Sequence, residues 1–460
     1  MTNEIIWEGR QGTNQEVDAA ISAARSAAAS WASFGVKERM VLIKHFQTQI
    51  EKHKKELALC ISKESGKPLW ESHSEVLAMT NKVALSMSAY EERSGTKQLS
   101  QTLTLSHKPH GVVAVFGPYN FPAHLPNSHI IPALIAGNTI VYKGSEHTPS
   151  VSQAVMHYFE KARFPNGVIN LLQGEAQTGQ YLALHPDLNA VFFTGSARVG
   201  ALLHSQFAAH VEKLLVLEMG GNNPLVVSKV ENEAAAALIT IQSAYLTAGQ
   251  RCTCARRLII INNDRFVKTL IEMIRTIHIG DFRDQPEPFF GPVINLAQKN
   301  KLLAAQENLI ELGGKALLKM KSLKEGTPLL SCGLIDMTSA IKIPDIEYFG
   351  PLLQLITVSN LDEAIAVAND TQYGLSATLL SSSEKEFTHF FNSINAGVIN
   401  WNEPTTGASS LAPFGGVKRS GNFRPSAYYA ADYCAYPVTS KKNQQLDLPQ
   451  TLPQGISWMK

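Results

Sequence analysis

Residues 112–143 read VVAVFGPYNFPAHLPNSHIIPALIAGNTIVYK, and this segment carries a pattern that repeats along much of the chain. Val112–Phe116 is a short apolar run that ends at Gly117-Pro118, a helical stretch follows to about Ala136, and Ile140–Tyr142 is a second apolar run. Short apolar runs bounded by turn residues are typical of buried strands. A helix between two such runs predicts a β-α-β unit with parallel strands.

The same alternation continues toward the C-terminus. Further strands are expected at Val168–Leu172, Val191–Phe193, Leu214–Leu217, Leu225–Val227 and Leu258–Ile261. Helices are expected to alternate with these strands, at 150–162, from about 197 to 209, at 231–248 and at 264–276. A new series starts near Pro224, just after Gly220-Gly221, so the pattern predicts two doubly wound parallel-sheet domains.

The segment before residue 112 is predicted to be mostly helical rather than to alternate strands with helices. Thr13-Asn14-Gln15-Glu16 is a capping box that opens a helix to about Trp31, and helical periodicity continues from Lys37 to Ser88. Thr102–Leu105 alternates polar and apolar residues, which is typical of an exposed hairpin strand.

Composition excludes several classes of protein. The 460 residues are 44% hydrophobic and 17% charged, with a formal net charge of +2, so the chain is expected to be globular with no nucleic-acid partner. The five cysteines are too sparse for a disulfide scaffold. Residues 1–10 lack the apolar core of a signal peptide, and no apolar run reaches membrane-spanning length. We expect a cytoplasmic protein with no membrane partner.

Ligands of doubly wound sheets bind beyond the carboxyl ends of the strands. Residues 195–200, Gly-Ser-Ala-Arg-Val-Gly, follow one predicted strand and open a helix, where free N–H groups attract phosphate. On its own this segment fits an ordinary turn equally well. Glu218 stands at another strand end before two glycines, and a surface carboxylate is the alternative there.

Cys252 follows a predicted helix, where a buried structural thiol is the common alternative. Cys252 and Cys254 have no His or further Cys nearby to complete a tetrahedral site, so we expect no metal.

Several short motifs occur together in one order. They are Pro118-Tyr119-Asn120-Phe121-Pro122, Lys143-Gly144-Ser145-Glu146, Phe193-Thr194-Gly195-Ser196, Leu217-Glu218-Met219-Gly220-Gly221, Gly249-Gln250-Arg251-Cys252, Glu347-Tyr348-Phe349-Gly350-Pro351 and Pro413-Phe414-Gly415-Gly416. With these motifs the chain resembles the NAD(P)-dependent aldehyde dehydrogenase superfamily from about residue 13 to about 435. The resemblance implies an aldehyde dehydrogenase-like fold: two doubly wound domains and a small β oligomerisation arm.

The resemblance also implies catalytic roles. Cys252 matches the family's nucleophile, which attacks the aldehyde as a thiolate. The Asn120 side chain and the Cys252 backbone N–H match the oxyanion hole. Glu218 matches the general base that activates water to release the acid.

The implied cofactor is NAD. Lys143 and Glu146 match residues that hold the adenosine ribose, and a carboxylate there would repel a 2′-phosphate. Glu347 and Phe349 match positions that hold the nicotinamide ribose and ring. The dinucleotide-binding loop is matched by Gly195, Ser196, Ala197, Arg198, Val199 and Gly200. Gly144 replaces the family's usual proline, so we expect a looser ribose loop.

Within the superfamily, the chain looks most like the dehydrogenases of N-succinylglutamate 5-semialdehyde, in arginine catabolism by the succinyltransferase route. The cues are Tyr119, residues 218–224, 251–257 and 420–426, and Tyr429-Ala430-Ala431-Asp432-Tyr433. Because that substrate carries carboxylates, Arg251 and Arg424 are candidates to bind it, and Lys418 and Arg419 are weaker ones. A solvated surface cation is the alternative for each.

Other functions stay open. Succinate semialdehyde and glutamate 5-semialdehyde are alternative acidic substrates. Glu218 argues against a CoA-acylating dehydrogenase, and the joint presence of Cys252, Glu218 and Asn120 argues against a catalytically silent protein on the same fold.

The resemblance implies a division of the chain. Residues 1–88 and 109–221 would form the NAD-binding domain, 222–420 the catalytic domain, and 89–108 with 430–445 an arm for a homodimer or homotetramer. The family usually begins with about twenty further residues that form strands before Glu4–Gly9, so we expect any effect of a shorter start on assembly rather than chemistry.

Overall fold

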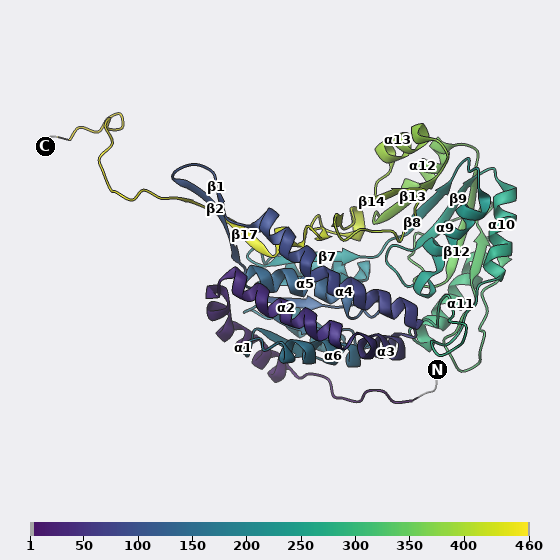
Figure 1. Cartoon of the computed structure of the whole chain (residues 1–460). Coiled ribbons are helices and arrows are strands. Elements are labelled where there is room, and N and C mark those ends of the chain that lie inside the picture. Colours follow the sequence, from purple (N-terminus) through teal and green to yellow (C-terminus); the bar gives the residue numbers. More distant parts are fainter. Residues whose placement is uncertain (1–3, 459–460) are drawn as a thin grey trace.

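The computed structural model describes residues 4–458. Two sheets, each flanked by helices, lie side by side, and a small antiparallel sheet projects from the first of them (Figure 1). This arrangement confirms the predicted α/β class.

The first sheet has the parallel strand order β5-β4-β3-β6-β7. Its strands are β3 (Val112–Phe116), β4 (Thr139–Lys143), β5 (Ile169–Leu172), β6 (Ala190–Gly195) and β7 (Leu214–Met219). Side chains of a strand alternate between its faces, and here Val113 and Val115 join one hydrophobic cluster while Val112 and Ala114 join another. The sheet is therefore buried on both faces.

Helices supply the cover for each face. The Val113 side packs against α2 (Val36–Lys52), α4 (Leu69–Ala89), α5 (His124–Ala136) and α6 (Pro149–Lys161), with α3 (Lys54–Ser65) beyond them. The Val112 side packs against α1 (Asn14–Ser33), α7 (Ala176–Leu184) and α8 (Ala197–Phe207). The capping box of Thr13 and Glu16 is present at the start of α1.

The second sheet has the order β10-β11-β12-β9-β8-β13-β14. Its strands are β8 (Asn223–Val227), β9 (Ala255–Ile261), β10 (Lys315–Leu318), β11 (Gly333–Asp336), β12 (Leu352–Val358), β13 (Ser376–Leu380) and β14 (Val398–Trp401). Its helices are α9 (Glu233–Tyr245), α10 (Asp264–Arg275), α11 (Leu296–Glu311), α12 (Leu361–Asn369) and α13 (Glu384–Ser393). The strand β10 runs antiparallel to β11, so this sheet is mixed at one edge rather than wholly parallel as predicted.

Every strand and helix expected between residues 112 and 276 is present, with two differences. The helix α7 lies in a stretch for which no element was predicted. The helix expected at 231–248 ends at Tyr245, because Thr247 and Ala248 adopt left-handed backbone angles with φ of 57° and 54°. That turn is the approach to Cys252.

The projecting sheet has the order β1-β2-β17, from β1 (Lys97–Gln98), β2 (Leu103–Pro109) and β17 (Ala435–Lys441). Residues 90–94, expected within the β arm, continue α4 as a π-helical turn, and α14 (Ala430–Tyr433) precedes β17. The remaining strands, β15 (Pro413–Phe414) and β16 (Ser426–Ala427), pair with each other. Beyond β17 the chain runs away from the body (Figure 1).

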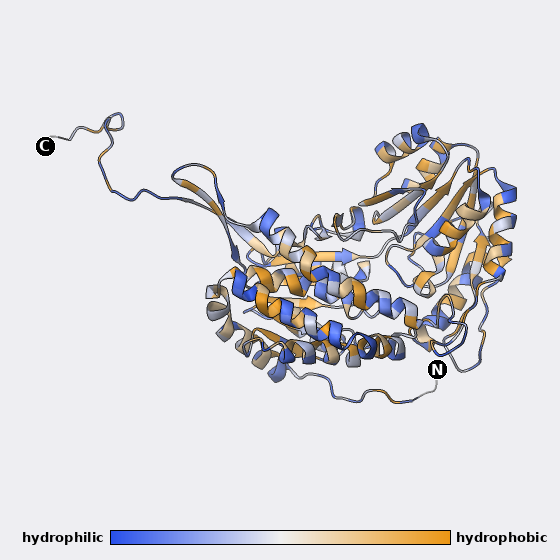
Figure 2. Ribbon diagram, in the orientation of Figure 1, coloured by the Kyte–Doolittle hydropathy of each residue, from blue (hydrophilic) through white to orange (hydrophobic). Residues whose placement is uncertain are grey.

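Hydropathy follows this layering. In Figure 2 the strands of the large sheets are mostly apolar, and the helices turn polar sides outward. Among residues 4–458 no helix has both the length and the apolar character needed to cross a bilayer. Within the same residues no group of three or more His, Cys, Asp or Glu side chains is arranged to hold a metal ion.

Candidate active site

A cavity of about 410 Å³ lies beyond the carboxyl ends of β3, β6 and β7 and reaches the loop that carries Cys252. The predicted residues that line it are Asn120, Glu146, Gly195, Ser196, Glu218, Cys252, Glu347 and Phe349. These residues come from segments up to 229 positions apart, between Asn120 and Phe349. The fold therefore gathers the predicted catalytic residues and half of the predicted cofactor residues in one place.

Cys252 lies on a tightly held turn. The turn Leu246–Gly249 before it is left-handed at three successive residues, ending with Gly249 at φ 70°. After it, the Asn223 side-chain amide donates hydrogen bonds to the carbonyl oxygens of Cys252 (2.7 Å) and Cys254 (2.9 Å). The nucleophile candidate is thus fixed from both sides of its backbone.

Asn120 follows β3 and is buried, with 6% of its surface exposed. Its Nδ2 donates to the carbonyl oxygen of Gln250 at 2.8 Å, which ties the end of β3 to the Cys252 loop. The amide nitrogen has a second hydrogen, so this bond leaves one donor for an oxyanion in the cavity.

Glu218 is the next-to-last residue of β7, and its carboxyl group is buried. Burial raises its pKa to about 8, although the Ser426 backbone N–H, 3.1 Å from Oε1, acts in the opposite direction. Its Oε2 has no hydrogen-bond partner in the part of the chain that the structure describes. A carboxyl group with this pKa and a free oxygen is suited to exchange a proton with water near neutral pH.

The Cys252 thiol has a pKa raised to about 12, first by burial and then by the negative charges of Glu347 and Glu218. Arg256 opposes this shift. Arg256 is fully buried and donates to the carbonyl oxygens of Arg251 (2.9 Å) and Gly350 (3.3 Å). Its positive charge therefore lies between the Cys252 loop and the Phe349 loop.

Glu347 lies beside the glycines that follow Glu218. Its Oε1 accepts a hydrogen bond from the Gly221 N–H at 3.3 Å, and a side chain at Gly220 would collide with its carboxylate. Burial raises the pKa of Glu347 to about 7, and Arg256 acts against that rise. The Phe349 carbonyl accepts from Gln298 Nε2 at 2.8 Å, and the Phe349 ring meets Tyr119 edge-on.

The predicted dinucleotide loop is only partly in the cavity. Gly195 and Ser196 line it, and Ser196 caps α8 by accepting from the Val199 N–H. Ala197 is buried, Arg198 is exposed, and Gly200 packs against Met219. A helix N-terminus that faces a cavity attracts phosphate, so the backbone here suits a dinucleotide.

Of the predicted ribose residues, Glu146 lines the cavity but Lys143 does not. Lys143 Nζ lies 3.8 Å from Glu146 Oε2 and donates to the Gly144 carbonyl at 3.2 Å. A Cβ at Gly144 would approach Ser152 Oγ within 1.9 Å, so Ser152 fills the space that a larger residue at 144 would need.

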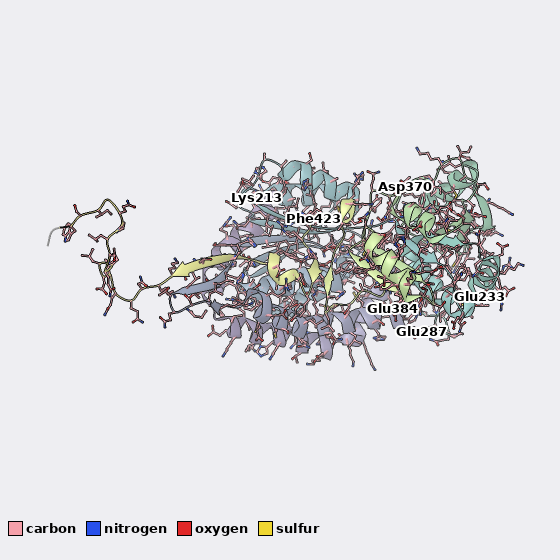
Figure 3. The ribbon with its side chains drawn as sticks, turned by 90° about the horizontal axis from the view of Figure 1, so that it is seen from above. Lys213, Glu233, Glu287, Asp370, Glu384 and Phe423 are labelled. Atoms are coloured by element: carbon pink, nitrogen blue, oxygen red, sulfur yellow. The ribbon has the colours of Figure 1, made fainter. Side chains whose placement is uncertain are left out.

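The predicted substrate cations do not gather at the cavity. Arg251 is adjacent to Cys252 but bonds to Glu71 Oε1 at 2.7 Å. Arg424 lines a separate hollow with Lys213, on the side of the molecule where Figure 3 shows Lys213 and Phe423. Lys418 donates to the carbonyls of Asn369 and Thr371, and Arg419 bonds to Gln372.

The sequence interpretation missed several residues that line or support the cavity. Gln298 and Lys301 lie one turn apart on α11 and both line it, as do His129 and His147. Asn223, which holds the Cys252 carbonyl, has no role in the sequence prediction beyond the motif 218–224. The spacing of Gln298 and Lys301 on one helix face was a usable signal, but nothing local linked that face to Cys252.

Comparisons with known proteins show the family and the fold of the chain. The aldehyde dehydrogenase family profile matches residues 1–438. The aldehyde dehydrogenase KauB from Pseudomonas aeruginosa is 28% identical, with a TM-score of 0.89 over 95% of this chain and 90% of that one. Betaine aldehyde dehydrogenase from Staphylococcus aureus, in complex with NAD+, is 26% identical, with a TM-score of 0.89 over 96% and 90%.

A third solved structure carries the other dinucleotide. Glyceraldehyde-3-phosphate dehydrogenase GapN from Methanocaldococcus jannaschii, complexed with NADP, is 25% identical, with a TM-score of 0.86 over 95% of this chain and 96% of that one. The family profile spans most of the chain, so this chain belongs to the aldehyde dehydrogenase family. It is an NAD(P)-dependent enzyme that oxidises an aldehyde to an acid.

Proposed function

We propose that this enzyme oxidises N-succinyl-L-glutamate 5-semialdehyde to N-succinyl-L-glutamate with NAD, through a Cys252 thioester. The observation that carries the reaction type is the convergence of Cys252, Asn120 and Glu218 on one cavity. The substrate itself is supported by the subfamily motifs of the sequence.

Each of the three side chains has a separate role in the proposed reaction. After the Cys252 thiol gives its proton to water, the thiolate Sγ forms a bond to the carbonyl carbon, the C=O π bond opens, and the oxygen takes the negative charge beside the Asn120 amide. A bound NAD would supply the hydride acceptor, and loss of the hydride from the former carbonyl carbon would leave the Cys252 thioester. Glu218 then takes a proton from a water whose oxygen attacks the thioester, which releases the acid and returns the cysteine sulfur.

The residues present fit a dinucleotide, with Gly195 and Ser196 at the N-terminus of α8 and Glu146 in the lining of the same cavity. The choice of NAD over NADP rests on Glu146, because its carboxylate would repel a 2′-phosphate. Solved relatives are found with either dinucleotide, so Glu146 is the residue to test. Glu146→Gln should improve kcat/KM for NADP relative to NAD.

An acidic substrate needs a cation near Cys252. Arg251 precedes the nucleophile, but its guanidinium is bound to Glu71 Oε1 at 2.7 Å and does not line the cavity, so it is not assigned to the substrate. Lys301 lines the cavity from α11 and adds positive charge. Arg424 lies in another hollow and is not part of this proposal.

The test is NADH formation, followed by absorbance, with the purified enzyme and a panel of aldehydes. We expect a kcat/KM for the succinylated semialdehyde at least tenfold above those for succinate semialdehyde, glutamate 5-semialdehyde and betaine aldehyde. Equal kcat/KM values for the four aldehydes would contradict the proposed substrate but would not affect the proposed reaction type. Cys252→Ala should abolish turnover with every aldehyde, and appreciable residual turnover would refute the nucleophile.

A further inference from the structure

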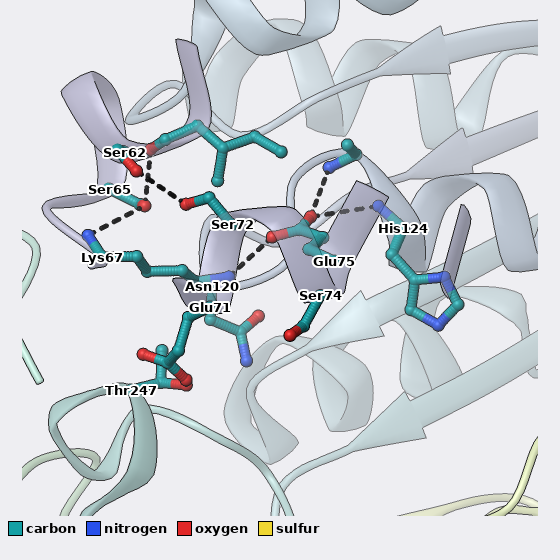
Figure 4. Close-up of polar contacts among 12 residues, drawn as sticks. Ser62, Ser65, Lys67, Glu71, Ser72, Ser74, Glu75, Asn120, His124 and Thr247 are labelled. Carbon is teal, nitrogen blue, oxygen red and sulfur yellow. Dashed lines mark hydrogen bonds and ion pairs between the residues drawn. The ribbon is translucent and has the colours of Figure 1, made fainter. Parts of the chain in front are cut away.

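Two acidic residues in the first two turns of α4 reach both halves of the catalytic centre. Glu71 and Glu75 are four residues apart, so they lie on one face of the helix. Both are buried, with 2% and 1% of their surface exposed. Figure 4 shows Glu75 directed toward His124 and Glu71 directed toward Thr247.

Glu75 holds the segment that carries Asn120. Its Oε1 accepts from the backbone N–H groups of Ala123 (2.9 Å) and His124 (3.1 Å), at the start of α5. Its Oε2 forms a fully buried ion pair with Lys67 Nζ at 2.6 Å. The loop between β3 and α5 is therefore anchored to α4 just after Asn120.

Glu71 holds the segment that carries Cys252. Its Oε1 accepts from Thr247 Oγ1 at 2.6 Å and from Arg251 Nη2 at 2.7 Å. Arg251 Nε also donates to Thr247 Oγ1 at 2.8 Å, which closes a ring of three side chains. The ring spans the left-handed turn and ends one residue before the nucleophile.

The ring accounts for two otherwise unexplained features. Thr247 is a β-branched residue at φ 57°, a conformation that persists only when its surroundings enforce it. Arg251 is also directed to Glu71 across 180 residues of sequence, although it stands beside the cavity.

We propose that Glu71 is a positioning residue: through Thr247 and Arg251 it sets the Cys252 thiol and backbone N–H against Asn120, which Glu75 holds from the same helix face. This inference rests on the proposed function of Cys252 and Asn120. Carbonyl attack depends on the placement of thiol and donors within about 1 Å. Thioester hydrolysis depends instead on Glu218, on β7, which α4 does not hold.

The test separates these two steps. Glu71→Gln keeps the size of the side chain but loses the charge that binds Arg251. We expect its pre-steady-state NADH burst to slow by about tenfold or more, given the cost of misplacing reacting groups. The KM for aldehyde and the Kd for NAD should change less than about twofold, since neither site is contacted by Glu71.

A second readout needs no dinucleotide. The rate at which iodoacetamide alkylates Cys252 in the enzyme alone should also change in Glu71→Gln. Thr247→Val removes the other partner while keeping a branched side chain, and it should slow the burst similarly. The double variant should be no slower than the slower single variant, because both remove the same ring.

Glu64→Gln is the matched control. Glu64 is a partly buried carboxylate that accepts from the Ser150 and Val151 N–H groups and so holds the start of α6, away from the Cys252 loop. We expect it to lower the melting temperature with an unchanged burst and alkylation rate.

A burst in Glu71→Gln equal to the parent's, or an effect confined to KM or melting temperature, would overturn the inference. If Glu71→Gln does not fold, an unchanged burst in Thr247→Val would overturn it equally. Absence of NADH formation from every aldehyde of the panel in the parent enzyme would instead refute the proposed function.

Discussion

At the scale of single residues, the catalytic centre carries several acidic groups close together. Cys252, Glu218 and Glu347 all have raised pKa values, and the negative charges of the two carboxylates raise that of the thiol further. Arg256 is the positive charge that opposes the shifts of Cys252 and Glu347. A fully buried arginine is costly unless its charge is used, so we assign Arg256 to support of the thiolate.

Replacing Arg256 tests that assignment. Arg256→Gln should raise the pKa of Cys252 further, because it removes the opposing cation. Each unit of increase lowers the thiolate fraction at pH 8 about tenfold, so iodoacetamide should alkylate Cys252 more slowly, by about tenfold for each unit of increase. Arg256→Lys keeps the charge and should retain most of the rate. Equal alkylation rates in both variants and the parent would show that Arg256 has only a packing role.

Glu218 should impose a pH dependence on thioester hydrolysis. Burial raises its pKa to about 8, and only the carboxylate can accept a proton, so hydrolysis should accelerate with rising pH and level off above about 8. Glu218→Gln should keep a stoichiometric NADH burst, slow the steady rate by about 10²–10⁴ and lose this profile. The check is stopped-flow measurement of burst and steady rates from pH 6 to 10. A Glu218→Gln steady rate equal to the parent's would reject Glu218 as the base.

At the scale of elements, the left-handed turn before Cys252 requires a glycine at position 249. Gly249 has φ 70°, and a Cβ there would lie 2.1 Å from the Gly350 carbonyl oxygen. Gly326 has φ 68° with nothing within 4 Å of its virtual Cβ. The two positions share a left-handed backbone, and only the buried Gly249 would bring a side chain into a clash.

Gly249→Ala should therefore destabilise the enzyme more than Gly326→Ala. Strain at a left-handed residue costs about 1–3 kcal/mol, which both variants share, and the clash adds to it at Gly249 alone. Gly249→Ala should also slow the NADH burst, since the Cys252 loop must move away from Gly350. Urea denaturation and burst kinetics give both quantities. Similar losses of unfolding free energy in the two variants would mean that the Gly249 and Gly350 loops can separate without a cost in stability.

Elements with a local pattern could be predicted from the sequence. The strands from Val112–Phe116 to Leu258–Ile261 followed from short apolar runs, and the alternation with helices gave the fold class. The antiparallel strand β10 and the end of α9 at Tyr245 could not be predicted, because partners distant in the sequence determine them.

The site residues, too, could be predicted only where a local motif identifies them. Cys252, Glu218 and Asn120 were found through motifs, and the structure brings them together. Arg251 looked like a substrate cation because no local signal reveals Glu71, its partner 180 residues earlier. Arg424 was chosen for its charge alone, and the chain places it in another hollow.

At the scale of the whole molecule, the cavity lies where the two large sheets meet, so its geometry depends on how they are held together. The helix α4 belongs to the first sheet's layer but bonds to Thr247 and Arg251 of the segment that leads into the second. The backbone N–H and indole N–H of Trp70 add bonds to Glu287 (2.9 Å) and to the Pro288 carbonyl (3.0 Å). Contacts between the sheets thus coincide with contacts that position the nucleophile.

The projecting sheet and the chain beyond it lie far from the cavity and suit another purpose. In the order β1-β2-β17, β17 is at an edge, and no strand among residues 4–458 pairs with its outer side. Past β17 the chain exposes apolar side chains away from the body, at Leu446, Leu448, Ile456 and Trp458. An unpaired edge followed by exposed apolar residues is the pattern of a surface that pairs with another chain.

We therefore predict that the enzyme is a homodimer or homotetramer held in part by this edge strand and by the chain that follows it. Removing residues 443–460 should shift the mass measured by light scattering after size-exclusion chromatography toward the monomer, with the shift growing on dilution. Val211→Ser is the control, because Val211 is 95% exposed on the body of the molecule and lies outside the arm, and it should leave the mass unchanged. A truncated enzyme with the parent's mass at every concentration would contradict the role of the tail and leave β17 and the body as the sources of any assembly.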